Sequence, residues 1–218
     1  LNNIMKKTMK NKQNIVTISP DLLLSKSIAI IGSSAHMTEK EEGNRIDSFD
    51  NVVRFNRAPV TGYESFVGSK TTLRVVNNHV FNNNQEDPEK WTGQPRYFIK
   101  NLKNSNILYF ARDQAPWWKR EENADESCNL YIVDYDLLEI LKNQYASSLE
   151  SDFSIGVGFA FLCVLSGLKP ELFGFDIDQE SSRSHYWEQR PPAGPCHNVS
   201  KEKELLLFLE EHEKIIIN

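Results

Sequence analysis

The chain has 218 residues, of which 39% are hydrophobic and 25% are charged, a composition typical of a globular domain rather than a disordered or fibrous chain. Its 25 basic and 30 acidic side chains leave a net charge of −5, which disfavours a nucleic-acid-binding protein. We therefore expect a single domain over residues 1–218, whose core forms without disulfides or structural metals.

Short apolar runs bounded by turn residues predict strands along the chain. The predicted strands are Ser27–Ile31, Asn51–Phe55, Thr72–Val76, Tyr97–Ile99, Ile107–Phe110, Tyr131–Val133 and Glu171–Phe175. Helices are predicted at Asp136–Gln144, Val157–Leu168 and Ser200–Glu213. Strands alternating with helices favour an α/β fold with a doubly wound, Rossmann-like sheet flanked by helices, where ligands bind beyond the carboxyl ends of the strands.

The last predicted helix carries an apolar stripe that we expect to face the core, formed by Leu205, Leu206, Phe208, Leu209 and His212. Its opposite face is acidic, which favours core packing over a helix lying on a membrane. Two segments rich in turn formers, Asn77–Gly93 and Gln189–Cys196, predict loops.

The cysteines Cys128, Cys163 and Cys196 are odd in number and widely spaced, so neither a C-x-x-C metal site nor a disulfide framework can be built from them. We therefore expect reduced thiols and a cytoplasmic location. No signal peptide is recognisable, and no apolar stretch reaches the roughly 18 residues of a membrane span. The sequence predicts a soluble protein that contacts a membrane only peripherally, if at all.

A turn of small residues, Gly32, Ser33 and Ser34, follows the first predicted strand. Gly32 would let the backbone approach a ligand, and the two serines offer hydroxyls and amides. The turn lacks the further glycines of the dinucleotide fingerprint and the Gly-Lys-Ser/Thr of a P-loop, which counts against NAD and ATP. By itself this sequence is more often a plain tight turn.

The second predicted strand is followed by Asn56 and Arg57, just before Pro59. Asn56 suits a ribose hydroxyl or a phosphate, because its amide can both donate and accept. Arg57 could bind a carboxylate or phosphate bidentately. From this segment alone, a surface ion pair is an equally good interpretation of the arginine.

Further polar groups surround the later helices. Residues 154–156 open an apolar helix, and the free amides and dipole at such a helix end would favour an anionic ligand. His185 with Glu188, and His197 with Glu202, are candidates for acid–base chemistry or metal ligation. No third ligand stands at metal-site spacing from them in the sequence.

Four ordered blocks resemble the sialyl motifs of the animal-type sialyltransferases. Residues 30–34, 46–59 and 67–72 resemble the large motif, and residues 154–175 the small motif. Residues 185–188, His-Tyr-Trp-Glu, resemble the third motif. Residues 197–202, in which four residues separate a histidine from a glutamate, resemble the very small motif. Agreement in four blocks in the family's order is a specific signal.

The resemblance implies a modified glycosyltransferase A-type fold and a metal-independent, inverting transfer of sialic acid from CMP-sialic acid to a glycan or glycolipid, with no cofactor. By position, His197 would be the general base and His185 would stabilise the departing phosphate, with Glu202 and Glu188 in support. Residues 176–178 have the form of an Asp-x-Asp metal motif, but the family has glycine at the first position. The implied donor-binding residues are Gly32, Ser33, Ser34, Asn56, Arg57, Ser154, Ile155, Gly156, Gly174, Phe175 and Tyr186.

The sequence also departs from the family pattern. Ser27 and Gly167 stand where the animal enzymes have the cysteines of a linking disulfide, which fits a cytoplasmic, bacterial or viral member. Ser33 and His36 replace two asparagines of the turn, and Ile155 replaces a threonine. These changes leave the identity of the donor open.

Other functions therefore remain open. One is a transferase that uses CMP-Kdo, since that sugar is also a 2-keto acid activated by CMP. Another is a catalytically silent CMP-sugar-binding module. A nicotinamide oxidoreductase is disfavoured by the missing glycines. Trp117 and Trp118 could stack on an acceptor sugar or serve only in packing.

Overall fold

The computed structural model describes residues 27–77, 106–110, 129–133, 154–175, 185–188 and 199–218. Its strands are β1 (Ile28–Ile31), β2 (Asn51–Phe55), β3 (Leu73–Asn77), β4 (Asn106–Phe110), β5 (Asn129–Val133), β6 (Glu171–Phe173) and β7 (Ile216–Ile217). Its helices are η1 (Ala35–Thr38), α3 (Gly43–Asp47), α4 (Glu64–Val67), α9 (Ile155–Leu165) and α10 (Val199–Glu211), of which η1 is a 3-10 helix.

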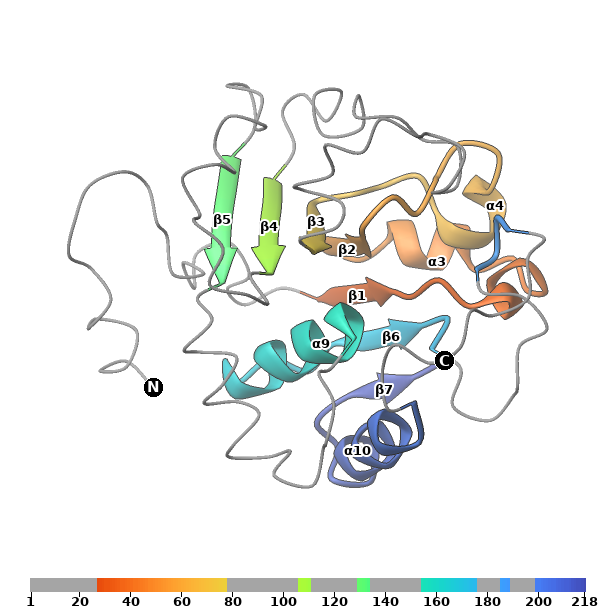
Figure 1. Ribbon diagram of the computed structural model, residues 1–218. Helices are drawn as coiled ribbons and strands as arrows, with labels where there is room; N and C mark the ends of the chain where they lie inside the picture. The colour runs from red at the N-terminus through yellow and green to blue at the C-terminus, as the bar shows by residue number, and fades with distance from the viewer. Residues whose placement is uncertain (1–26, 78–105, 111–128, 134–153, 176–184, 189–198) are drawn as a thin grey trace.

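The strands form a seven-stranded sheet in the order β5-β4-β3-β2-β1-β6-β7, and every neighbouring pair is parallel (Figure 1). The chain winds outward from β1 to β5 and then returns to place β6 on the other side of β1. The winding direction therefore reverses between β1 and β6, where doubly wound sheets bind their ligands beyond the carboxyl ends of the strands.

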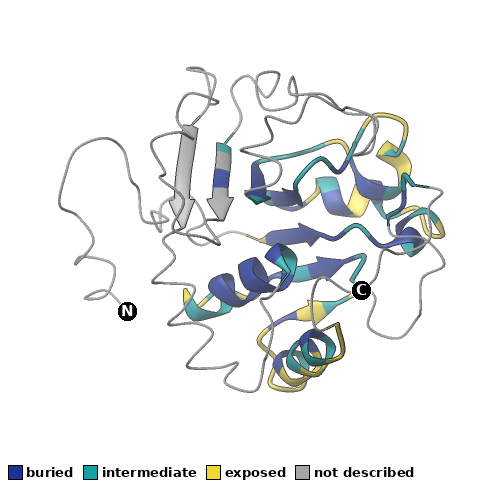
Figure 2. Ribbon diagram, in the orientation of Figure 1, coloured by how far each residue is buried: buried dark blue, intermediate teal, exposed yellow. Residues whose placement is uncertain are grey.

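Helices cover both faces of the sheet. On one face, α9 and α10 pack on apolar side chains of β1, β2, β3 and β6. On the other face, η1, α3, α4 and residues 186–187 enclose a second apolar cluster. The described side chains of β1, the second to fifth residues of β2 and the first four of β3 are buried, as expected for a parallel sheet covered on both faces (Figure 2).

The predicted strands and helices that fall within the described residues are confirmed, with shifts of one to three residues at most of the ends. Helix α9 ends at Leu165, earlier than predicted, because Gly167 adopts φ +80. The amide of Leu168 donates to Cys163 and that of Gly167 to Val164, each at 3.0 Å, which closes the helix as a Schellman motif. The predicted elements Tyr97–Ile99 and Asp136–Gln144 lie outside the described residues, as do residues 78–93 and 189–196 of the predicted loops.

The prediction for the inward face of α10 is partly wrong. Leu206 and Leu209 are buried, but Phe208 is 53% exposed and its ring lies 4.1 Å from that of His212, which is also exposed. Helix α10 lies at the β7 edge of the sheet, so only a narrow stripe of it meets the core (Figure 1). None of the described helices is long and apolar enough to cross a membrane.

Candidate active site at the β1–β6 switch point

The turn after β1 and the turn after β6 touch each other. The amide of Gly32 donates to the carbonyl of Phe173 at 2.7 Å, and the amide of Ser34 donates to that of Gly174 at 3.2 Å. A Cβ at position 32 would collide with the Gly174 carbonyl oxygen. The structure gives a further reason for the glycine, because its open side meets the neighbouring turn. A donor contact from the Gly32 backbone stays a prediction.

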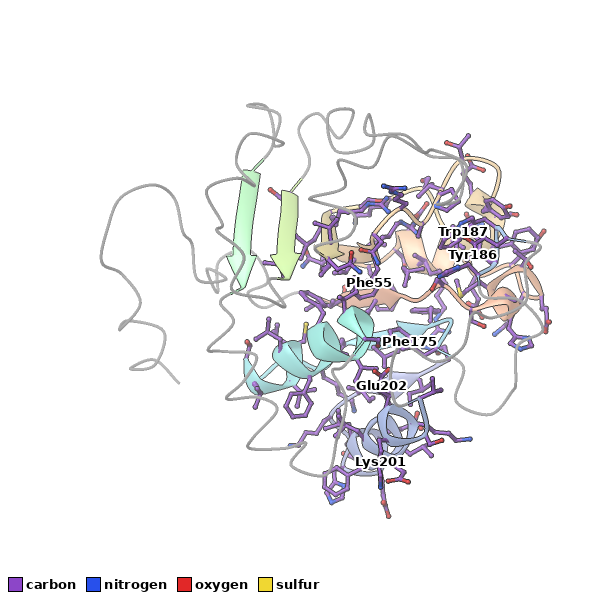
Figure 3. All side chains as sticks on the ribbon, in the orientation of Figure 1. Phe55, Phe175, Tyr186, Trp187, Lys201 and Glu202 are labelled. Atoms are coloured by element: carbon purple, nitrogen blue, oxygen red, sulfur yellow. The ribbon has the colours of Figure 1, made fainter. Side chains whose placement is uncertain are left out.

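Two more of the predicted donor-binding glycines are pressed against side chains. Gly174 has φ +69, and a Cβ there would meet the side chain of Met37 within 2.5 Å. At Gly156, a Cβ would lie 3.1 Å from the ring of Phe175, which reaches across from the β6 turn to the start of α9 (Figure 3). The turn after β6 is therefore closely packed against η1 and the start of α9.

The third motif is anchored to the large motif through Tyr186. Its amide donates to the carbonyl of Ser33 at 3.0 Å, and its hydroxyl donates to the carbonyl of Pro59. The ring is buried and lies 5.0 Å from that of Tyr63. Burial raises the pKa of Tyr186 to about 12, against the opposing charges of nearby arginines. The side chain of this predicted donor-binding residue thus holds its segment against the site.

His185 is held in a defined orientation. Its Nδ1 lies 2.9 Å from a carboxylate oxygen of Glu188, and its ring stacks on Trp187 at a centroid distance of 4.4 Å. The imidazole is 38% exposed and the carboxylate 11%. Since Glu188 occupies Nδ1, Nε2 is the ring atom left to meet a ligand. The second predicted histidine, His197, lies outside the described residues.

The very small motif is joined to the small motif. The carboxylate of Glu202, in the first turn of α10, accepts a hydrogen bond from the amide of Ser154. Ser154 caps α9, because its hydroxyl accepts from the amide of Val157 at 3.3 Å. Hydrogen bonds therefore link the large motif to the small and third motifs, and the small motif to the very small motif.

Asn56 follows β2 in a left-handed conformation, with φ 45, which asparagine tolerates better than most residues. Its side-chain oxygen accepts from the amide of Asn77 at 3.1 Å, so this oxygen is used at the end of β3. The NH₂ group is the part of Asn56 that we expect to meet a phosphate or ribose. Arg57 is partly buried, and this burial lowers its pKa.

Two buried arginines were missed by the sequence analysis. Arg54 is 0% exposed, and its guanidinium donates to the carbonyls of Val67, Gly68 and Lys70 at 2.6 to 3.2 Å. Arg74 is 4% exposed; burial, together with the charge of Arg54, lowers its pKa to about 10. A charged residue inside the otherwise apolar run of a central strand was the signal that could have pointed to them.

Arg74 holds the segment that follows β2 in place. Its Nη1 donates to the backbone carbonyls of Asn56 at 3.2 Å and Ala58 at 2.9 Å. Arg54 meanwhile fixes residues 67–71, the final part of the large motif. Both arginines thus hold the loops that follow β2 and α4.

A cavity of about 440 Å³ opens beside the switch point, and this volume lies within the usual range for small-molecule sites. Three predicted donor-binding residues, Ser34, Gly174 and Phe175, line it. The other lining residues come from η1 and the segment after it, β6, α10 and the C-terminus: His36, Met37, Glu39, Lys40, Glu42, Phe173, Leu207, Glu210, Ile217 and Asn218. The candidate donor site therefore adjoins a space of mixed polar and apolar character.

Within the described ranges, no group of three histidine, cysteine or acidic side chains could hold a metal ion. The Asp-x-Asp segment at residues 176–178 lies outside those ranges, as do Trp117, Trp118, Cys128 and Cys196. Cys163 is a free, buried thiol in α9. Metal independence stays a prediction.

The profile of glycosyltransferase family 29 (sialyltransferase) matches residues 1–214. The chain belongs to this family. The resemblance of its four motifs to the sialyltransferases is thereby confirmed. The joined motif blocks at the switch point are therefore those of this family.

Individual relatives agree with the family assignment. The chain is 27% identical to the human CMP-N-acetylneuraminate-β-1,4-galactoside α-2,3-sialyltransferase over 219 residues, covering 89% of this chain and 58% of the relative. It is 26% identical to the rat protein of that name, with the same coverage. The human β-galactoside α-2,6-sialyltransferase 2 is 32% identical over 104 residues, covering 44% of this chain and 18% of that protein. The chain thus spans little more than half of the first two relatives.

Solved structures show the same fold. A mammalian sialyltransferase in complex with Gal-β-1-3GalNAc-ortho-nitrophenol superimposes with a TM-score of 0.65 at 21% identity, covering 94% of this chain and 75% of that one. Another mammalian sialyltransferase structure gives a TM-score of 0.66 at 20% identity, covering 98% and 82%. The parallel α/β sheet is therefore the family's fold.

Proposed function

We propose that this chain transfers sialic acid from CMP-sialic acid to a hydroxyl of a glycan, with inversion and without a metal ion. The observation that carries the proposal is the linkage of the four sialyl-motif blocks by hydrogen bonds around the β1–β6 switch point. Residues far apart in the sequence thereby come together at the carboxyl ends of the strands, where doubly wound folds bind nucleotides. We also assign the sheet to the modified glycosyltransferase A type.

The donor would lie across the switch point. In this arrangement the start of α9, from Ser154 to Gly156, meets the cytidine, while Ser34 and the NH₂ group of Asn56 approach the phosphate. Hydroxyl groups and side-chain amides are good donors to phosphate oxygens. The cavity beside Ser34 and Phe175 would give room to the sugar.

His185 would act on the leaving group. When the bond from C2 of the sugar to the CMP oxygen breaks, negative charge develops on the phosphate and positive charge on the sugar. A donor fixed in advance stabilises that charge without reorganising. The bond from Nδ1 to Glu188 and the stacking on Trp187 support this role, because they hold the imidazole in place.

His197 would act on the acceptor. As the acceptor oxygen forms its bond to C2, opposite the departing CMP, the hydroxyl proton passes to the neutral imidazole. This single displacement inverts the configuration at C2. General-base catalysis of this kind contributes about 10²–10⁴-fold in rate.

The acceptor and the location of the protein are also proposals. The relatives are named for galactosides, so a galactoside-bearing glycan or glycolipid is the acceptor to test first. Ser27 and Gly167, at the family's disulfide positions, support a cytoplasmic location, where thiols stay reduced. Contact with a membrane would then be peripheral.

Ligand-dependent thermal unfolding tests the donor. The chain is heated in EDTA with CMP, CMP-sialic acid, CMP-Kdo, a UDP-sugar or no ligand. At about 100 times its Kd, a ligand should raise the Tm by roughly 5–11 °C for a chain of this size. We expect this rise with CMP and CMP-sialic acid. A rise with CMP-Kdo but not CMP-sialic acid would change the assigned sugar, and no rise with any cytidine nucleotide would refute a donor site.

A transfer assay with a galactoside acceptor then tests the reaction. We expect sialylated product in EDTA. Activity that disappears in EDTA and returns with Mn²⁺ would overturn metal independence and point to residues 176–178. Binding of CMP-sialic acid without transfer to any glycan would instead identify a silent binding module.

A further inference from the structure

Glu202 is a charged residue buried between two helices. Its side chain turns toward α9, whereas the neighbouring Lys201 lies on the outer side of α10 (Figure 3). Glu202 is only 9% exposed, and Lys201 pairs with the exposed Glu204 at 2.9 Å. Burying a carboxylate is costly unless it is well compensated. The groups that compensate the buried carboxylate therefore indicate the role of Glu202.

The compensation comes from two helix ends. Glu202 lies in the first turn of its own helix, α10, where a negative charge is favourable. Its carboxylate also accepts the amide of Ser154, which caps α9 and in turn bonds the amide of Val157. A continuous connection therefore runs from α10 through Ser154 into the first turn of α9.

This arrangement changes the electrostatics expected at the start of α9. From the sequence we expected the helix end to favour an anionic ligand. The carboxylate of Glu202 already supplies a negative charge there, and a second anion would be repelled by it. The start of α9 therefore suits an uncharged group better than a phosphate.

We propose that Glu202 is a positioning residue for the donor nucleoside. By holding the Ser154 amide, it fixes the backbone of Ile155 and Gly156 where these residues meet the uncharged cytidine, and its charge keeps the phosphate away from this helix end. The inference rests on the proposed function, but it assigns Glu202 to donor binding rather than to proton transfer by His197.

Three variants of α10 separate these roles. Glu202→Gln keeps an oxygen that can accept from Ser154 but removes the charge, whereas Glu202→Ala removes both. Glu204→Ala is the control, because Glu204 is exposed on the same turn. Binding of cytidine, CMP and inorganic phosphate is measured by calorimetry on the full chain. The pH profile of kcat/KM is measured for the same proteins.

We expect Glu202→Ala to weaken cytidine and CMP binding by on the order of tenfold, the usual effect of losing a hydrogen bond to a charged group. Glu202→Gln should bind cytidine within about twofold of the wild type, bind inorganic phosphate more tightly, and keep the pH profile, since an amide can replace the acceptor but not the charge. Glu204→Ala should match the wild type throughout.

A second pair of variants tests the same bond from α9. Ser154→Pro removes the amide hydrogen, and the φ of −58 at this position is compatible with proline. Ser154→Ala removes only the hydroxyl and is its control. We expect Ser154→Pro to weaken cytidine binding well beyond Ser154→Ala, and to add little to Glu202→Ala in the double variant. This pair remains informative if Glu202→Ala does not fold.

The inference is overturned if Glu202→Gln loses as much cytidine affinity as Glu202→Ala, or if the pH profile shifts in Glu202→Gln. It is also overturned if Ser154→Pro behaves like Ser154→Ala. In all these cases the wild type still binds CMP, so the proposed function stands. If the wild type itself binds neither CMP nor cytidine, the proposed function fails as well.

Discussion

Gly32 and Gly174 let the β1 and β6 turns lie in direct contact. The bond from Ser34 to Gly174 and the bond from Gly32 to Phe173 both depend on this closeness. A side chain at Gly32 would overlap the Gly174 backbone and separate the turns, whereas one at Gly174 would meet the side chain of Met37. The effect of Gly32 on function is therefore indirect, through the distance between two backbones.

Gly32→Ala tests this contact. We expect the variant to lose about 2 kcal/mol or more in unfolding free energy, because the new methyl group would overlap the Gly174 backbone, which cannot move aside without breaking the β1–β6 pairing. Urea denaturation followed by circular dichroism measures the loss. Gly167→Ala is the control: its Cβ meets open space, so only the strain of φ +80, about 1 kcal/mol, should appear. Equal losses in the two variants would contradict the contact.

The two histidines of the candidate site should differ in their effects. His197→Ala should lower kcat by about 10²-fold or more while CMP affinity changes only a few-fold, because a general base acts in the chemical step. His185→Ala should lower kcat and also weaken CMP binding, because this ring would contact the phosphate. Steady-state kinetics with CMP titrations measure both, and His212→Ala on the exposed end of α10 is the control. If His197→Ala left kcat unchanged, His197 would not be the general base.

Asp47 should make the large motif sensitive to acid. Partial burial alone would raise its pKa, but hydrogen bonds from Ser69 and Lys70 outweigh this and lower it below 3.8. A group whose pKa is lower in the folded state stabilises above its unfolded pKa and loses this effect as pH falls through the folded value. The wild type should therefore exceed Asp47→Asn in stability at pH 7, and the difference should shrink below about pH 4. A difference that does not change with pH would show that charge is not the cause.

At the scale of elements, neighbouring apolar residues of helix α10 differ sharply in their exposure to solvent. Leu209 is 5% exposed and packs with α9 and the sheet, whereas Phe208 is exposed. The sequence pattern placed both residues on the core side, because a leucine-rich run offers more than one apolar stripe. The position of the helix at the sheet edge selects which stripe is buried.

Neighbouring substitutions in α10 test this assignment. Leu209→Ala should cost about 2–5 kcal/mol in unfolding free energy, since it leaves a cavity in the core. Phe208→Ala should stay within about 1 kcal/mol, because its ring is mostly in solvent. Chemical denaturation measures both. A large loss of unfolding free energy in Phe208→Ala, with a small loss in Leu209→Ala, would show that α10 buries the Phe208 side instead.

At the scale of the whole molecule, α9 is the central helix of one sheet face, and Cys163 on it is 0% exposed. Burial raises the pKa of its thiol well above the ordinary value, so the reactive thiolate is scarce in the folded state. Reaction at this residue therefore reports opening of the helix from the sheet.

Alkylation of Cys163 should accordingly follow global unfolding. With iodoacetamide in increasing urea, we expect modification of the peptide that carries Cys163 to rise at the same urea concentration as the loss of circular dichroism. Mass spectrometry of the digested protein measures the modification, and a free cysteine-containing peptide is the control for intrinsic reactivity. Rapid modification well below the transition would mean that α9 opens separately.

Much of this protein was determined by the sequence alone. The strands, the helices and the sialyl-motif blocks depend on residue types at short spacing, and local chemistry carries that information. Helix α9 ends three residues before the predicted Leu168, because Gly167 adopts a left-handed conformation while the apolar pattern continues beyond Leu165.

Tertiary structure alone decided the rest. The contact of Gly32 with Gly174, the carbonyl cradle of Arg54 and the bond from Glu202 to Ser154 join residues distant in the chain, and no local pattern reports which distant groups will meet. The exposure of Phe208 depended in the same way on where α10 lies relative to the sheet. Burial and hydrogen-bond pairing depend on how the helices pack on the two faces of the sheet. The sequence alone therefore does not reveal them.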